Sequence, residues 1–160
     1  KKPNDKANFE SCLYKARQGD TQAQNNVGVM YKLGDGVTQD YKQAVKWYRK
    51  AAEQGFAEAQ YNLGEMYAVN QDYKQALKWL TKAAEQGRAE AHYKLGYFYG
   101  AGLLGFPVDR EMAHMWFNIA ASSGYKDAKK FRDLFAKEMS PSQIEKAQDM
   151  ARKWTAKHQD

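Results

Sequence analysis

The 160-residue sequence has one cysteine, three prolines and no long hydrophobic run. With Cys12 alone, the chain can form neither an internal disulfide nor a thiolate zinc cluster. The few prolines, together with many Ala, Gln, Lys, Leu and Met residues, favour helices over sheets. No stretch approaches the roughly 20 apolar residues that cross a bilayer, so we expect no transmembrane segment. These absences indicate a chain folded from helices.

The usual motifs of enzymes and metal sites are also missing. The sequence contains no Gly-x-Ser-x-Gly, Walker, His-Glu-x-x-His or paired-cysteine motif. The GDGVTQD loop at 34–40 lacks the alternating ligands of a calcium loop. We therefore expect no enzyme, no catalytic residue, no metal site and no cofactor.

An internal repeat fills most of the chain. The segment KAAEQGFAEAQYNLG at 50–64 returns as KAAEQGRAEAHYKLG at 82–96. Each repeat has Gly-x-x-x-Ala and then Leu-Gly or Val-Gly followed by Tyr in a first helix, and Ala-x-x-Trp followed by Ala-Ala in a second. These spacings place the apolar side chains on one face of each helix, which indicates stacked helical hairpins.

We expect a single repeat domain over 1–160, with length differences confined to loops. Asp40, Asp72 and Asp109 stand where each caps a second helix, and Ser140 opens a predicted capping box. The predicted parts are an N-terminal capping helix at 5–18, repeats at 19–54, 55–86 and 87–123, and a C-terminal cap at 124–160.

Several unusual residues fall on structural positions of the repeat. Gly28, Gly64 and Gly96 share one position in the three first helices. Glycine inside a helix costs about 1 kcal/mol relative to alanine, so we expect a neighbouring helix to approach each glycine closely. His92 and His114 replace Gln, Val or Leu at equivalent positions, and we interpret both as structural rather than catalytic.

These elements resemble known repeat families. They are similar to the tetratricopeptide pattern, with Gln24, Gln60 and His92 in place of its Trp. The GDGV loop at 34–37 and the Ala-x-x-Trp spacing resemble the Sel-one-like repeat (SLR) family more closely, over roughly 19–124. The resemblance implies an all-α fold, namely a right-handed α-solenoid of stacked antiparallel helix pairs with capping helices at both ends.

The resemblance also implies a function and a location. It implies a non-catalytic scaffold or adaptor that binds a partner protein or an extended segment in its concave groove. The sequence does not define the oligomeric state, and we favour a monomer. An immunity or inhibitor protein against a secreted effector or cell-wall enzyme is an alternative. The tail resembles exported bacterial members, so we expect the bacterial periplasm or secretion, with the cytoplasm as the alternative. Because the sequence starts at Lys1 without a Met or an apolar signal core, either a leader was cleaved or the chain was trimmed.

The faces of the first helices opposite the core form the candidate binding surface. At about 100° per residue, Tyr61 and Glu65 lie nearly opposite Leu63, so we expect this stripe to be exposed and to line the groove. Tyrosine rings can anchor a partner and asparagine amides can bond an extended backbone. The predicted groove residues are Asn25, Asn26, Val29, Glu58, Tyr61, Asn62, Glu65, Glu90, Tyr93, Lys94 and Tyr97.

Lysines spaced four apart on the second helices form a candidate basic patch. The net charge of +6 admits an anionic partner if the charge is clustered. Glu53 and Glu85 offset part of it and no stacking aromatics are interleaved, so a solvated face is favoured over a nucleic-acid site. Binding of an anionic polymer by this convex patch is the second alternative function. The patch consists of Lys42, Lys46, Lys50, Lys74, Lys78 and Lys82.

Overall fold

The structure is a computed structural model that describes residues 3–103 and 106–159. Within these ranges it contains nine α-helices and no strand, which confirms the predicted all-α class. The chain divides into two compact units, residues 1–70 and 71–160, which are described one at a time. None of the described helices combines the length and the apolar character that spanning a membrane requires.

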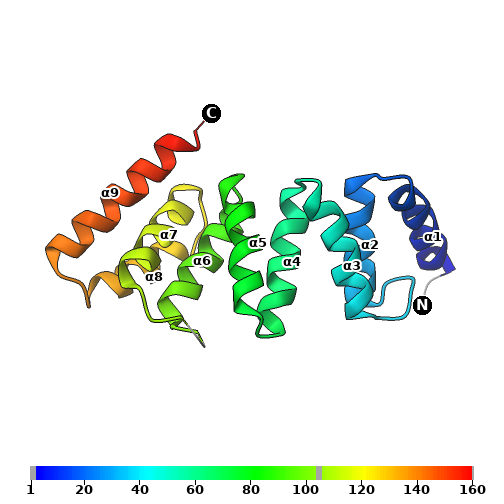
Figure 1. Cartoon of the computed structure of the whole chain (residues 1–160), viewed down its shortest axis with the longest axis horizontal. Coiled ribbons are helices and arrows are strands. Elements are labelled where there is room, and N and C mark those ends of the chain that lie inside the picture. The colour runs from blue at the N-terminus through cyan, green and yellow to red at the C-terminus, as the bar shows by residue number, and fades with distance from the viewer. Residues whose placement is uncertain (1–2, 104–105, 160) are drawn as a thin grey trace. The chain divides into compact units, whose positions relative to one another are not determined.

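The unit at 1–70 contains four helices in succession (Figure 1). They are α1 (Pro3–Arg17), α2 (Thr21–Leu33), α3 (Tyr41–Glu53) and α4 (Ala57–Val69). Each helix packs against the next along the chain. The core of this unit includes Phe9, Ala16, Ala23, Val27 and Trp47.

The unit at 71–160 is arranged around one central helix. It contains α5 (Tyr73–Glu85), α6 (Ala89–Ala101), α7 (Arg110–Ser122), α8 (Ala128–Ala136) and α9 (Pro141–Lys157). Helix α7 packs against α6, α8 and α9, and α5 packs against α6. A core cluster of this unit includes Ala113, Phe117, Ala120 and Ala128.

Carboxylate and hydroxyl caps begin the helices where the sequence predicts them. The side chains of Asp40, Asp72 and Asp109 each accept a hydrogen bond from the backbone amide three residues later, at 3.1, 3.2 and 2.9 Å. The predicted capping box is also confirmed, because Ser140 and Gln143 exchange backbone-to-side-chain bonds at 3.2 and 2.9 Å. Such caps satisfy amide donors that have no partner inside the helix.

The repeated glycines allow close helix contact. A Cβ on Gly28 would lie 2.6 Å from the Tyr48 ring, and a Cβ on Gly96 would lie 2.8 Å from the Phe117 ring. Neither distance is compatible with an alanine at an unchanged backbone position. The predicted close approach is therefore confirmed at both positions, and each aromatic ring packs directly on the helix backbone.

The C-terminal helix covers the last helical pair as predicted. Ala147 and Ala151 of α9 are buried. On the same helix, the Trp154 ring meets the Trp116 ring of α7 at 5.4 Å between centroids. At the other end of the chain, the helix predicted at 5–18 spans Pro3–Arg17.

We expect Gly28→Ala to lower the free energy of unfolding by up to about 2 kcal/mol, because overpacking costs about 1–3 kcal/mol and is offset by the roughly 1 kcal/mol gained in helix propensity. Urea denaturation followed by circular dichroism measures the change. The control is the same substitution in a Tyr48→Leu background, since leucine stands at the equivalent position 80. Equal losses in both backgrounds would show that the Tyr48 ring is not the reason for the glycine.

Candidate protein-interaction surface

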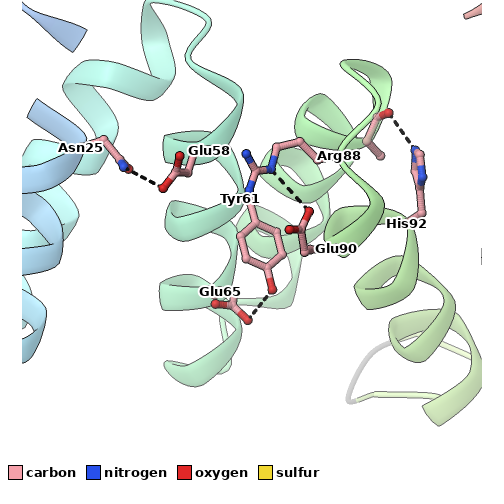
Figure 2. A network of polar contacts seen from close by, with 8 residues as sticks. Asn25, Glu58, Tyr61, Glu65, Arg88, Glu90 and His92 are labelled. Atoms are coloured by element: carbon pink, nitrogen blue, oxygen red, sulfur yellow. Dashed lines mark hydrogen bonds and ion pairs between the residues drawn. The ribbon is translucent and has the colours of Figure 1, made fainter. Parts of the chain in front are cut away.

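A polar network joins the first helices of the repeats in the unit at 1–70. Asn25 of α2 is fully buried. Its amide nitrogen donates to Glu58 Oε1 at 3.3 Å, and its amide oxygen accepts from Asn62 Nδ2 at 3.0 Å. Figure 2 shows the Asn25 side chain pointing toward Glu58. The network thus bridges α2 and α4 through one buried amide.

The prediction that Asn25 is exposed in the groove is therefore wrong. The rotation of about 100° per residue along a helix gives the direction of a side chain relative to the core of its own hairpin. It says nothing about contacts with the first helix of the next repeat, whose Glu58 and Asn62 cover the Asn25 amide. A residue opposite the hairpin core can for this reason be buried between two repeats.

The other predicted residues of this unit remain accessible. The hydroxyl of Tyr61 donates to Glu65 Oε1 at 2.9 Å, which fixes the ring along α4 (Figure 2). Asn26 is exposed, and the other five residues of the set named next are half-buried. We call this set the α2–α4 face: Asn26, Val29, Glu58, Tyr61, Asn62 and Glu65.

A polar pocket of about 420 Å³ opens between α1 and α2. The repeat pattern did not predict this pocket, although α1 carries a polar stripe at helical spacing. Burial raises the pKa of the Cys12 thiol, whose sulfur lies 3.7 Å from the Ala23 carbonyl oxygen. The thiol is therefore held in its protonated form at neutral pH. The pocket is lined by Asn8, Ser11, Cys12, Lys15, Asp20, Gln22, Ala23, Asn26 and Met30.

In the unit at 71–160, the predicted groove residues all lie on α6, but their surroundings differ. Tyr97 is 54% exposed. Glu90 lies 3.6 Å from the Arg88 guanidinium (Figure 2), and Lys94 is half-buried. The predicted residues of this unit are Glu90, Tyr93, Lys94 and Tyr97.

Tyr93 does not face away from the core as predicted. Its ring stacks on Tyr125 at 4.4 Å and meets the Phe117 and Phe131 rings edge-on at 5.6 and 5.8 Å. Burial also raises the pKa of its phenol. The residues that follow the last repeat, including α8, cover this side of α6, which the pattern within the repeats did not reveal.

Three buried polar side chains occupy the position at which the tetratricopeptide pattern has Trp. Gln24, Gln60 and His92 each bond the carbonyl oxygen of the residue eight positions earlier, at 3.2, 3.2 and 3.0 Å. Figure 2 shows this contact for His92. His114 is also buried, and burial lowers its pKa. The hydrogen bond gives His92 a structural contact between α5 and α6.

Three of the six lysines of the predicted basic patch lie over tryptophan rings. Lys50 Nζ lies 4.9 Å from the Trp47 ring centroid, and the Nζ atoms of Lys78 and Lys82 lie 5.2 and 5.7 Å from that of Trp79. Such contacts hold an ammonium over an aromatic face and shield the ring from water. All six lysines of the patch, including Lys42, Lys46 and Lys74, are exposed.

The helices and their polar first-helix faces define a helical-repeat protein. The Sel1 repeat model matches residues 21–56, 57–87 and 89–125, and the chain belongs to this family. The SLR resemblance is thereby confirmed. Among the described residues, no group of three His, Cys, Asp or Glu side chains is placed to hold a metal ion.

Two solved bacterial structures are similar to this chain. A Sel1 repeat protein from Oxalobacter formigenes is 37% identical with a TM-score of 0.68, and the match covers 82% of this chain and 59% of that one. A protective antigen of uropathogenic Escherichia coli with an SLR fold is 28% identical with a TM-score of 0.54, over 94% of this chain and 41% of that one. Both similarities support the predicted fold class.

Shorter matches occur in two larger proteins. A putative sel1-like repeat-containing protein of Acanthamoeba polyphaga mimivirus is 44% identical over 52 residues, which is 32% of this chain and 10% of that protein. The ERAD-associated E3 ubiquitin-protein ligase component HRD3A of Arabidopsis thaliana is 34% identical over 61 residues, which is 38% of this chain and 9% of that protein. The matched segments thus span about a tenth of these relatives.

We expect Asn25→Ala to lower the free energy of unfolding by about 1–3 kcal/mol, because it leaves the Glu58 carboxylate and the Asn62 amide without their shared partner. The matched control is Asn26→Ala, an exposed neighbour of the same type, which should change stability by less than about 0.5 kcal/mol. Urea denaturation measures both. Equal effects would contradict a structural role for the buried amide.

Proposed function

We propose that the chain is a non-catalytic scaffold that binds a partner protein through its first-helix faces. The observation that carries the proposal is the hydrogen bonding of the α2–α4 face. Asn62 is held by Asn25, and Tyr61 is held by Glu65. Side chains that are already ordered lose less entropy when a partner binds, so such a surface is suited to recognition.

The chemistry of this face favours an extended basic segment of the partner. Asn26 and Asn62 offer amides to a peptide backbone, and the Tyr61 ring offers a rigid anchor. The Glu58 and Glu65 carboxylates favour a lysine or arginine in the bound segment, because the face contains no cationic side chain of its own.

The family relationship supports a scaffold role. Sel1 repeat proteins are generally protein-interaction scaffolds, and one relative is a component of an E3 ubiquitin-protein ligase. The solved neighbours come from bacteria, and our proposal extends to a bacterial protein of the periplasm or the secreted fraction. An immunity or inhibitor protein would use the same face to block its target.

Binding of an anionic polymer by the lysines is a less favoured function. Three of the six ammonium groups lie over tryptophan rings, where they stabilise the fold. A polymer phosphate or carboxylate would have to compete with those contacts.

We expect Tyr61→Ala to weaken binding of a captured partner at least tenfold, since a buried aromatic anchor contributes about 2 kcal/mol or more at an interface. The partner is first captured by crosslinking in an extract of the source cells and is then titrated against the purified chain by calorimetry. Tyr41→Ala is the matched control, because Tyr41 is an exposed tyrosine on α3.

Circular dichroism checks that both variants remain folded. If Tyr61→Ala binds the partner as tightly as the unchanged chain, the α2–α4 face is not the binding surface. Equal weakening by the Tyr41 variant would also exclude a specific role for this face.

A further inference from the structure

The ring of His92 lies in an aromatic cluster built by three helices. His92 of α6 stacks on Trp116 of α7 at 5.7 Å and meets Trp154 of α9 edge-on at 5.0 Å. Trp154 in turn stacks on His158 of the same C-terminal segment at 4.1 Å. The packing of α9 on α6 therefore runs through the His92 ring.

The hydrogen bonds of His92 define which nitrogen carries the proton. Nε2 lies 3.0 Å from the Ala84 carbonyl oxygen, and a carbonyl only accepts, so the neutral ring keeps its hydrogen on Nε2. Nδ1 is buried and has no hydrogen-bond partner among the described residues. A second proton would therefore create a buried N–H without an acceptor and a buried charge, which both cost free energy.

The burial of His92 outweighs the neighbouring groups that would favour its protonated form. Burial is the largest influence and lowers the pKa of His92, whereas the hydrogen bond to the Ala84 carbonyl of α5 is the second largest and raises it. His158, which directly follows α9, lowers the pKa, and Glu90 of α6 has the smallest influence and raises it. Helix α7 contributes the uncharged Trp116 ring. The balance keeps the imidazole neutral at pH 7.

The equivalent positions of the other repeats show what the histidine adds. Gln24 and Gln60 make the same bond to a carbonyl eight residues earlier, at 3.2 Å each. Glutamine has no ionisable group, so these repeats hold their helices independently of pH. A titratable side chain stands at this position only in the repeat against which α9 docks.

We propose that His92 is an acid-sensitive latch for α9, whose protonation loosens the C-terminal helix from α6 and α7 while α5 stays folded. A released ring binds a proton near the ordinary value of 6.5, whereas the docked ring binds one only at a lower pH. The docking of α9 is therefore fully stable above pH 6.5. It is lost progressively as the pH falls below that value toward the pKa of the docked ring.

Hydrogen exchange measured by mass spectrometry tests the latch at pH 7.5 and pH 5.5, after correction for the intrinsic exchange rate. In the unchanged chain we expect the opening constant of α9 amides to rise by up to about tenfold at the lower pH. His92→Gln should remove most of this rise, because glutamine keeps the carbonyl bond and does not titrate. His114→Leu is the matched control, a second buried histidine whose loss should leave the response of α9 intact.

Three outcomes would overturn the latch. One is an α9 response in His92→Gln equal to that of the unchanged chain. Another is an equal acid-induced opening of α5, which would indicate unfolding of the whole unit.

If His92→Gln does not fold, NMR titration of the unchanged chain decides: an imidazole pKa at or above 6.5 contradicts the latch, and a lower pKa that coincides with loss of α9 protection supports it.

Discussion

Both units depend on the contact between a bare stretch of helix backbone and an aromatic ring. Gly28 receives the Tyr48 ring, and Gly96 receives the Phe117 ring, with no room for a Cβ. This contact sets how closely the first helix of a repeat approaches its second helix. The approach is similarly close in both units, so the same contact between glycine and ring recurs in repeats whose other side chains differ.

That regular packing places polar groups where each must find a partner. Gln24, Gln60 and His92 point back to a carbonyl of the preceding helix, and Asn25 bridges two first helices. Buried polar groups cost free energy unless they are bonded, so these contacts favour one register of the helices over others. Apolar contacts thus set the distance between neighbouring helices, and polar contacts set their register.

The same packing leaves part of the first-helix surface for the proposed partner. The α2–α4 face presents hydrogen-bonded polar side chains to solvent, which suits a scaffold of the Sel1 repeat family. In the last repeat, the structural position is occupied by His92, and the C-terminal helix closes over it with Trp154. The repeat position that holds a glutamine in two repeats therefore holds a titratable side chain in the third.

The sequence by itself determined the helices, their caps at Asp40 and Ser140, and the close approach at Gly28, because these features depend on local spacing and on repetition. Only the tertiary structure decided which polar side chains of the first helices are accessible. Asn25 is covered by α4 and Tyr93 by the residues around Tyr125, and a helical wheel contains no information about a neighbouring element. Exposure is a property of the packed arrangement, whereas periodicity is a property of the chain.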